Sequence, residues 1–206
     1  MVNQLPPEIK DSADVVELVN LAKSKAGNHL DAIGALDALI ETQGPSSESE
    51  GLIGGRYKKL YQEAFDPGDK ARYLNDAIKH YELGMLLDLN DYYPSSNLPR
   101  LYRARKHTGD EDKARAVAQV VYFACRRARE RGLVDEFLRP TLLGAAFDAG
   151  DVQAAETLHE EIVADGIAGW RLDTTLADLE MSLKHVDDPD RQRALRTVCD
   201  RLKGLL

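Results

Sequence analysis

Residues 109–114 read Gly-Asp-Glu-Asp-Lys-Ala, and the pattern that they define recurs along the chain. In it, Asp or Asn directly follows a glycine and an alanine stands five positions after that glycine; further copies begin at Gly27 and Gly150. A fourth copy begins at Gly68, with its alanine, Ala77, about one helical turn later. Because successive glycines lie 41 residues apart, the pattern indicates an internal structural repeat.

The pattern predicts the bend of a helical hairpin. Glycine ends a helix at little conformational cost because it readily adopts positive φ angles. The Asp or Asn beside it can cap the next helix, and the small alanine one turn later lets the two helices approach closely. Apolar residues with helical spacing flank the copies, and strand patterns are nearly absent. We therefore expect an all-α protein.

The repeat predicts a right-handed α-solenoid of about five hairpins that resemble tetratricopeptide repeats, in a single domain over residues 1–206. The first helices of the hairpins would line a concave surface. The expected helices lie near residues 12–26, 28–43, 49–65, 69–88, 95–108, 110–131, 135–149, 151–164, 170–185 and 189–204. The residues expected in the core are Leu36, Leu39, Leu60, Tyr81, Leu101, Ala114, Val121, Leu142, Leu158 and Ile162.

Local signals place several helix boundaries. The break at 44–47 reads Gly-Pro-Ser-Ser, so Ser47 or Ser49 is expected to cap the next helix. A bend is expected at 91–94, because Pro94 disfavours the α conformation in Tyr93. Pro99 is then expected in the first turns of the helix that follows.

Composition limits the class of protein. Apolar residues make up 43% and charged residues 30% of the chain, which is typical of a folded domain. The sequence contains neither an apolar run long enough to cross a membrane nor an N-terminal secretory signal. Cys125 and Cys199 are expected to be reduced, buried thiols. These features predict a cytoplasmic protein without membrane association.

The net charge of −8 is unevenly distributed. Residues 100–139 contain 11 basic and 6 acidic side chains, a net charge of +5, whereas residues 1–50 and 140–206 each have a net charge of −6. An acidic chain with a basic middle favours a small anionic ligand over an extended nucleic acid.

Residues 48–58 read Glu-Ser-Glu-Gly-Leu-Ile-Gly-Gly-Arg-Tyr-Lys and resemble a motif of a known family. The TPR-like sensor (TPR-S) domain tends to read Glu-(Ser/Thr)-x-Gly-Leu-x-Gly-Arg-x-Tyr-Lys at this point. Such domains accompany TIR, caspase-like and other effector domains in bacterial immune systems. A related region, called the TRAF-binding region, precedes the kinase domain of animal apoptosis signal-regulating kinases. Gly55 stands at the family's arginine position, and Arg56 follows it.

A second part of the family pattern, Ala-Ile-x-x-Tyr-x-x-Gly, matches residues 77–84. The Tyr-x-Gly-Ile-Asn element that follows in the family is matched at Tyr93 and Asn97, with two serines in place of Gly-Ile. The resemblance covers about residues 48–110. It implies a sensor of a nucleotide-derived signal that acts on behalf of a fused or partner effector in antiviral defence.

The candidate ligand-binding residues are cationic, aromatic or amide side chains of this stretch: Arg56, Tyr57, Lys58, Lys59, Tyr92, Tyr93, Asn97, Arg100 and Arg103. Lysine and arginine bind phosphate or carboxylate groups, and tyrosine can stack on a base. Because first helices adjoin in a solenoid, we expect these residues to lie on one surface.

Each candidate also has an ordinary structural alternative. The lysines and arginines could be solvated surface residues, Tyr57 could belong to the core, and Asn97 could cap a helix. The three glycines at 51, 54 and 55 are costly in a helix, and they could permit either close helix packing or the approach of a ligand. The sequence leaves these alternatives open.

The sequence contains no recognisable set of catalytic residues. The five histidines are scattered, and the spacings typical of metal ligands, phosphate-binding loops and nucleophile elbows do not occur. We therefore expect no enzyme activity, metal or cofactor. The first hypothesis is a sensor module that binds a small anionic, nucleotide-like ligand in the concave groove and regulates a partner effector protein. The alternative is a scaffold that binds a peptide or a partner protein.

Overall fold

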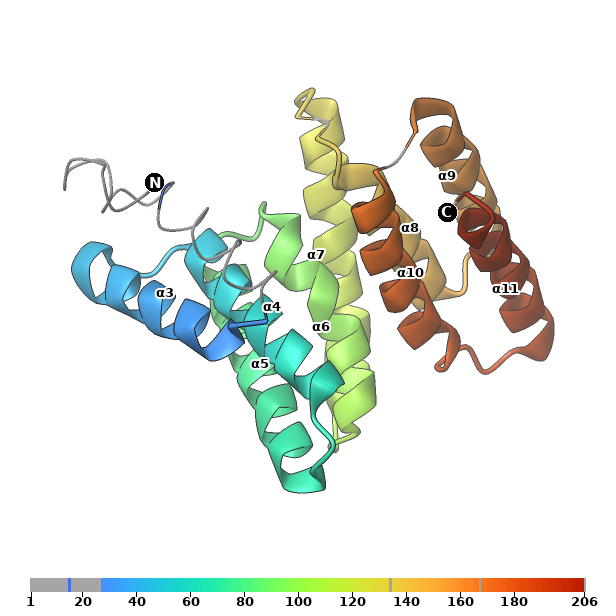
Figure 1. Cartoon of the computed structure of the whole chain (residues 1–206). Coiled ribbons are helices and arrows are strands. Elements are labelled where there is room, and N and C mark those ends of the chain that lie inside the picture. The colour runs from blue at the N-terminus through green and yellow to red at the C-terminus, as the bar shows by residue number, and fades with distance from the viewer. Residues whose placement is uncertain (1–14, 16–26, 134, 167, 206) are drawn as a thin grey trace. The chain divides into compact units, whose positions relative to one another are not determined.

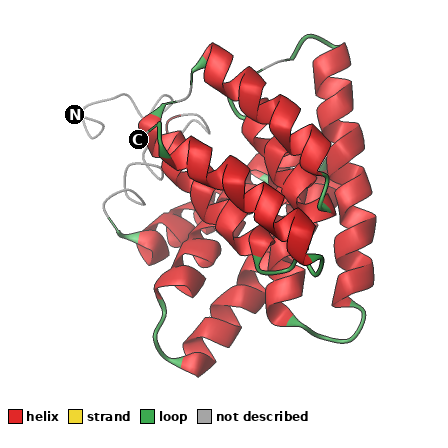
Figure 2. Cartoon of the chain, turned by 90° about the vertical axis from the view of Figure 1, so that its right-hand side faces the viewer, coloured by secondary structure: helices red, strands yellow, loops and turns green. Residues whose placement is uncertain are grey.

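The structure, a computed structural model, describes residues 15, 27–133, 135–166 and 168–205. All regular secondary structure in these residues is α-helical, as Figure 2 shows, so the all-α prediction is confirmed. The helix predicted near 12–26 lies outside the described residues except for Val15. Within the described part of the chain, no helix has the length and apolar character needed to cross a membrane.

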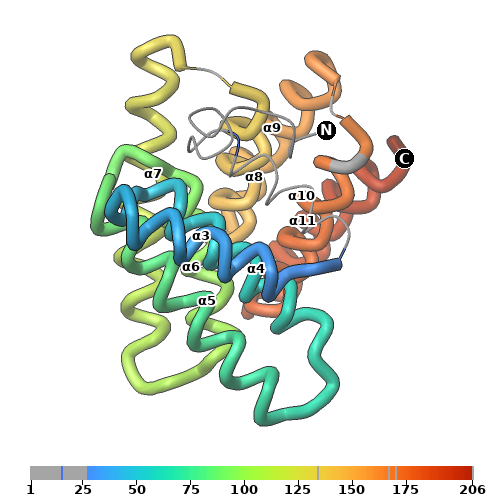
Figure 3. The backbone as a smooth tube through the Cα atoms, turned by 60° about the vertical axis from the view of Figure 1, so that its left-hand side comes forward, coloured from blue at the N-terminus to red at the C-terminus, as the bar shows by residue number. Residues whose placement is uncertain are grey.

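The first of two compact units comprises Met1–Asp88. Its described helices are α3 (His29–Gln43), α4 (Ser47–Glu63) and α5 (Pro67–Leu87) (Figure 1). α4 and α5 form an antiparallel hairpin (Figure 3), and α3 packs against α4. Ile33 and Leu36 of α3 form a buried apolar cluster with Ile53 of α4.

The second unit, Leu89–Leu206, contains three successive helical hairpins in its described residues. Its helices are α6 (Tyr92–Arg105), α7 (Asp110–Glu130), α8 (Leu138–Ala149), α9 (Val152–Asp165), α10 (Gly169–Leu183) and α11 (Pro189–Lys203). α8 packs against both α6 and α10, and α9 packs against α11 (Figure 1). The first helices of successive hairpins therefore adjoin, as in tetratricopeptide-type repeats.

The repeat pattern marks three bends and four close packing positions. Gly27, Gly109 and Gly150 adopt positive φ angles of 82°, 83° and 66°, which glycine tolerates without a Cβ clash. The alanines of the pattern are all buried: Ala32, Ala77, Ala114 and Ala155. The predicted hairpin bends are therefore confirmed at Gly109 and Gly150, and the close packing is confirmed at the four alanines. The helix predicted before Gly27 lies outside the described residues.

Gly68 is the exception, because it lies inside the first turn of α5 and does not adopt a positive φ angle. The chain bends just before it, at Asp66. The Asp66 carboxylate accepts hydrogen bonds from the backbone N–H groups of Gly68 and Asp69, both at 2.9 Å. Pro67 occupies the first helical position, where its missing N–H has no cost. The helix is thus capped by Asp66, three residues before Asp69, the cap that the repeat predicts.

Other caps also differ from the prediction. Ser46, rather than Ser47 or Ser49, caps α4, while Ser49 supplies the reciprocal bond of a capping box. Asp151 and Asp188 cap α9 and α11 as local sequence rules predict. Each of these carboxylates accepts hydrogen bonds from backbone N–H groups at the start of its helix.

The predicted core is largely confirmed. Leu60 and Leu142 are half-buried, and the other predicted core residues are buried. Cys125 and Cys199 are buried and form no disulfide with each other. Burial raises the pKa of the Cys125 thiol to about 12 and that of Cys199 to about 11, so both remain protonated at neutral pH.

His159 in α9 has a desolvated imidazole. Both ring nitrogens are buried, and neither has a hydrogen-bond partner among the described residues. Burial lowers the pKa of His159 below its ordinary value of 6.5, and Arg201 lowers it further, against the opposing effect of Glu156 and Glu160. The folded chain therefore resists protonation at this ring.

We expect the free energy of unfolding to decrease as the pH falls from about 7.5 to about 5.5, and to decrease less in His159→Phe. The unfolded chain takes up a proton near pH 6.5 that the folded ring excludes, so acid favours the unfolded state. Urea denaturation at a series of pH values measures the difference. Because burial also lowers the pKa of His185, His159→Phe/His185→Phe should have a flatter profile still. A wild-type pH profile in the single variant would contradict the prediction.

Candidate ligand-binding site

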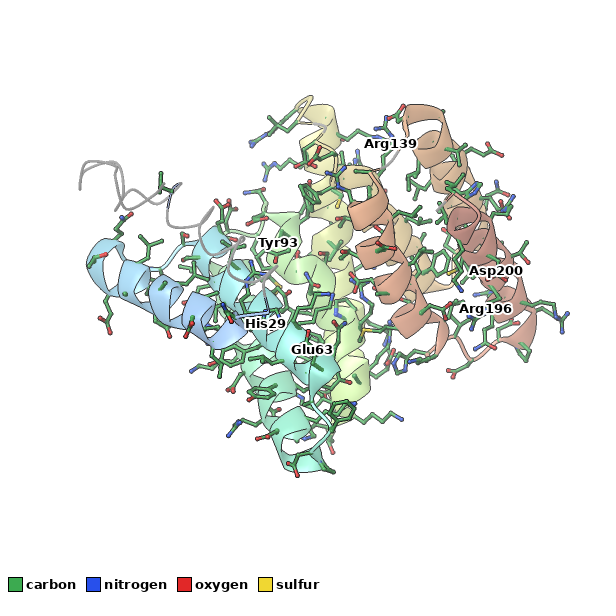
Figure 4. The ribbon with its side chains drawn as sticks, viewed as in Figure 1. His29, Glu63, Tyr93, Arg139, Arg196 and Asp200 are labelled. Carbon is green, nitrogen blue, oxygen red and sulfur yellow. The ribbon has the colours of Figure 1, made fainter. Side chains whose placement is uncertain are left out.

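α4 carries four of the candidate residues and is fixed at both ends. At its start, Ser46 and Ser49 exchange hydrogen bonds between side chain and backbone N–H, both at 3.0 Å. At its end, the Glu63 carboxylate lies 3.5 Å from Nε2 of His29 in α3 (Figure 4). The capping box fixes the start of α4, and the His29–Glu63 contact joins its end to α3.

Gly54 lies where α4 packs closely against α5. A Cβ atom added at Gly54 would come within 2.9 Å of the Tyr81 ring, a distance that real Cβ contacts essentially never show. Tyr81 is itself buried on α5, so its ring has little room to retreat. For Gly54, close helix packing is therefore the explanation that the structure supports.

A row of rings continues along the same interface, one helical turn after Gly54. The Tyr57 ring stacks on the His80 ring with a centroid separation of 5.5 Å, and the Tyr73 ring lies 6.3 Å from Tyr57. The His80 Nδ1 atom lies 2.7 Å from the carboxylate of Glu50, a buried residue of the first turns of α4. Stacking and hydrogen bonding thus join the two helices beside the Gly54 contact.

Tyr57 is half-buried in this row. Burial, and to a lesser extent the carboxylates of Asp76 and Asp37, raises the pKa of its hydroxyl. The hydroxyl therefore keeps its proton at neutral pH and can donate a hydrogen bond. The half-buried position of Tyr57 agrees with the alternative that this residue belongs to the core. The hydroxyl is the polar group of its side chain.

The cationic candidates of α4 differ in exposure. Arg56 and Lys58 are buried, whereas Lys59 is exposed and has no carboxylate at ion-pair distance among the described residues. Lys58 follows Gly55 by three residues and Gly51 by seven, so the three share one face of α4. Because neighbouring helical residues point about 100° apart, this face differs from the one on which Tyr57 meets α5.

The start of α6 corrects the predicted bend at 91–94. Asp91 caps the helix by accepting a hydrogen bond from the backbone N–H of Tyr93 at 2.9 Å, and the helix begins at Tyr92. Pro94 fits because a first-turn N–H has no partner within the helix. Asn97 is consequently inside α6 and does not cap it; its amide donates to the Tyr93 carbonyl at 2.9 Å.

The two tyrosines at this end have different surroundings. The Tyr92 hydroxyl donates a 2.5 Å hydrogen bond to the Asp135 carboxylate, and burial followed by this bond raises the pKa of Tyr92. Tyr93 is 39% exposed (Figure 4). Of the two, Tyr93 presents the larger ring surface to solvent.

Pro99 lies well inside α6, contrary to the prediction that it stands in the first turns. It has no N–H for the Ser95 carbonyl, and its ring disturbs the hydrogen bonds of that turn. The side chain of Arg100 compensates in part, because its Nη2 donates to the Ser96 carbonyl at 2.9 Å. Arg100 thus stabilises its own helix.

Arg100 and Arg103 belong to a buried group of charges that we term the Asp148 network. Its members come from α6, α8 and α10: Arg100, Arg103, Asp148, Asp178 and Ser182. The Asp148 carboxylate lies 3.0 Å from Arg100 Nη1 and 3.5 Å from Arg103 Nη1, and it accepts a 2.8 Å hydrogen bond from Ser182. Asp178 lies 3.5 Å from the Arg100 guanidinium. The network therefore joins three helices of the second unit.

Arg103 is mostly buried, contrary to the alternative that it is a solvated surface residue. Only 11% of its side chain is exposed, and its guanidinium also contacts Glu111 at 3.1 Å. Burial, followed by the positive charges of Arg103 and Lys106, lowers the pKa of nearby His185. A glutamate at 103 would face Asp148 and Glu111, so we expect it to reduce stability.

The candidate residues divide between the two units. Arg56, Tyr57, Lys58 and Lys59 lie on α4 of the first unit, and the other five lie on α6 of the second. Within the first unit, α4 presents the cations and the tyrosine on different faces. Within the second unit, Arg100 and Arg103 converge on carboxylates, so their charge is already compensated.

Sequence reasoning missed three residues that organise these sites: Glu50, His80 and Asp148. Glu50 resembles any first-turn carboxylate, which favours a helix N-terminus without a specific partner. Asp148 stands two residues before a repeat glycine, where a solvated helix end is the usual interpretation. A usable signal was the excess of positive charge in residues 100–139, since buried arginines require carboxylate partners elsewhere in the fold.

The described residues contain no cluster of three or more His, Cys, Asp or Glu side chains that could hold a metal ion. Their chemistry is that of ion pairing, hydrogen bonding and ring stacking.

Comparison with known proteins identifies one family. Residues 1–102 match the family model described as Tetratricopeptide Repeats-Sensor. No curated protein and no solved structure gives a significant match. The matched range includes α3, α4, α5 and most of α6, and hence every candidate residue except Arg103. The resemblance inferred from residues 48–110 is therefore confirmed.

We expect Gly54→Ala to lower the free energy of unfolding by about 1–3 kcal/mol, because the new Cβ overlaps the Tyr81 ring. The matched control is Gly34→Ala in α3, where a Cβ meets nothing within 4 Å. This control should stabilise the chain by up to about 1 kcal/mol, since alanine is the better helix former. Urea denaturation of both variants tests the opposite signs, and stabilisation by both would contradict the packing role of Gly54.

We expect Asp148→Asn to lower the free energy of unfolding by about 3 kcal/mol, because it leaves buried arginine charge without its central carboxylate. The control is Asp190→Asn, which removes the same charge from an exposed pair with Arg193 and should have little effect. Equal effects of the two substitutions in urea denaturation would show that the Asp148 network is not a determinant of stability.

Proposed function

Because residues 1–102 belong to the tetratricopeptide repeat sensor family, we propose that the chain is a sensor that binds a small anionic, nucleotide-like ligand at α4 and thereby regulates a partner effector. The family assignment by itself indicates a sensing or protein-interaction role. The ligand class and the antiviral context, which sensor domains of bacterial immune systems suggest, are the further parts of the proposal.

The face of α4 formed by Gly51, Gly55, Lys58 and Lys59 is the observation that carries the proposal. Gly54, four residues before Lys58, lies at one edge of this face and packs against α5 together with Tyr57, whereas Gly55 lies four residues before the exposed Lys59. Gly51 and Lys58 are buried and Gly55 is half-buried, so Lys59 is the exposed cation of this face. Lysine ammonium groups bind phosphate as point charges. Gly55, which has no side chain, leaves room beside Lys59 for such a group.

In this proposal the remaining candidates have supporting roles. Tyr57 holds α4 against α5 through its contacts with His80 and Tyr73, and Arg100 and Arg103 hold α6 within the Asp148 network. Tyr93, whose ring is exposed on α6 of the second unit, is a separate candidate for stacking on a base and is not assigned to the α4 site. Lys58 and Lys59 are the proposed ligand contacts.

A scaffold that binds a partner protein is the second candidate function, and α5 supplies an observation in its favour. Leu83, Leu86 and Leu87 near the end of α5 are 40%, 70% and 47% exposed. Their spacing of three and four residues places them on one face of the helix. An apolar stripe of this kind is typical of protein-interaction surfaces.

Thermal-shift screening against a nucleotide panel tests the proposal, because a ligand that binds only the folded state raises Tm. For a nucleotide that binds, Lys58→Ala and Lys59→Ala should each weaken the affinity about tenfold, which corresponds to about 1.4 kcal/mol. The control is Lys79→Ala, an exposed lysine of α5. Affinity should also fall with added salt, since screening weakens the attraction.

The scaffold alternative predicts a different result. No nucleotide would then shift Tm, whereas Leu86→Ser would abolish binding of the partner protein. If a nucleotide binds and both α4 lysine variants retain wild-type affinity in calorimetry, the ligand site lies elsewhere in the chain.

A further inference from the structure

The outward face of α7 carries two adjacent aromatic side chains in the second unit. Tyr122 is 50% and Phe123 59% exposed, and their rings meet edge to face with centroids 5.3 Å apart. The opposite face of α7 supplies the buried contacts of the helix: Ala114, Val117, Val121, Ala124, Cys125 and Ala128. The aromatic pair is therefore not needed to bury that face.

Helix geometry surrounds the pair with polar side chains. Gln119 precedes Phe123 by four residues, Arg126 follows it by three and Arg127 follows it by four. These spacings place the three residues on the same side of α7 as Phe123. All three are exposed. An apolar centre with a rim of hydrogen-bond donors results, which is the usual composition of a protein-interaction site.

The rim is positively charged. The Arg127 guanidinium donates a 2.7 Å hydrogen bond to the neutral side-chain carbonyl of Asn90, which leaves its charge uncompensated by that contact. Arg126 pairs with Glu130 four residues later, with both side chains about 60% exposed. Exposed pairs of this kind exchange readily for another carboxylate because each is weak. The surface can therefore present both arginines to an acidic partner.

The arginines alone have a simpler explanation, because basic residues near a helix C-terminus interact favourably with the helix dipole. That explanation does not extend to Tyr122 and Phe123, which gain nothing from the dipole and lose the benefit of burial. An exposed aromatic pair beside exposed arginines is the combination enriched at binding hot spots. Both features together require a partner that is apolar and acidic.

We propose that Tyr122 and Phe123, with Arg126 and Arg127, form a docking site for an acidic segment of a partner protein that inserts an apolar side chain between carboxylates. Charge complementarity identifies the occupant: an apolar side chain contacts the two rings while flanking carboxylates pair with the arginines. A nucleic acid fits less well, since Glu130 lies among these arginines and the whole chain has a net charge of −8. The residues of the docking site are distinct from those of the ligand site proposed on α4.

Selection of short random peptides on the full chain tests the docking site and does not require the natural partner to be identified first. Peptides enriched on the wild-type chain should combine Asp or Glu with Phe, Leu or another large apolar residue. One synthetic peptide of this composition is then measured by fluorescence anisotropy. Phe123→Ser and Arg126→Gln/Arg127→Gln should each weaken its binding at least about tenfold, and added salt should weaken it further.

Matched controls separate the docking site from general surface effects. Val163→Ser removes an exposed apolar side chain from α9, and Arg193→Gln removes an exposed arginine from α11; both should bind the peptide as the wild type does. Circular dichroism should show unchanged helix content in every variant. If Phe123→Ser alters folding, Tyr122→Ser replaces it in the test.

Four results would overturn the proposal. The first is a selection that enriches no acidic apolar peptide, and the second is a selected peptide that binds the α7 variants with wild-type affinity. The third is single-stranded RNA that binds through Phe123 more tightly than any selected peptide. A second copy of the chain would instead reveal itself as self-association lost in Phe123→Ser, which also contradicts the proposed partner.

Discussion

The arrangement of the second unit depends on the contacts of the Asp148 carboxylate. It lies on α8, accepts contacts from two arginines of α6 and is hydrogen-bonded by Ser182 of α10. A buried carboxylate without such partners would cost several kcal/mol, and so would either arginine alone. The three helices therefore have to adopt the one arrangement that satisfies all these charges together. This requirement restricts which arginines remain for a ligand.

In the first unit, the contact between α4 and α5 depends on close packing rather than on charge. Gly54 allows the Tyr81 ring to lie directly on the backbone of α4, and the Tyr57–His80 stack continues the contact along the helices. A partly buried polar contact accompanies this packing, because the His80 Nδ1 atom lies 2.7 Å from the Glu50 carboxylate. A glycine that costs about 1 kcal/mol of helix propensity is thus compensated by aromatic burial.

The sequence predicts the features that depend on nearby residues. Local chemistry explains the positive φ angles at Gly27, Gly109 and Gly150 and the burial of the alanines. The 41-residue spacing indicates where this pattern recurs in the sequence. The same local rules failed at Tyr93, where a bend was predicted but the Asp91 cap begins a helix. They also failed at Pro99, which was predicted in the first turns of its helix but lies well inside α6. Competing local signals of similar strength cannot be ranked without the tertiary contacts.

The roles of the arginines were beyond prediction for a different reason. Their partners Asp148 and Asp178 lie 48 and 78 residues from Arg100, and no periodicity connects such positions. The lysines of α4 and the arginines of α6 therefore looked equivalent in sequence, although Arg100 and Arg103 share the Asp148 carboxylate.

A sensor needs a physical link between the ligand and the partner, and binding alone does not supply one. A ligand at α4 can change the affinity of another surface only if it binds two conformations of the chain with different affinity. Such coupling is reciprocal, so an acidic partner at α7 would alter the ligand affinity by the same factor. Packed contacts such as Gly54–Tyr81 and the Asp148 network are suited to this role, since closely packed groups switch between discrete arrangements rather than deform gradually. The residues that hold each unit together are therefore also those through which a signal would have to act.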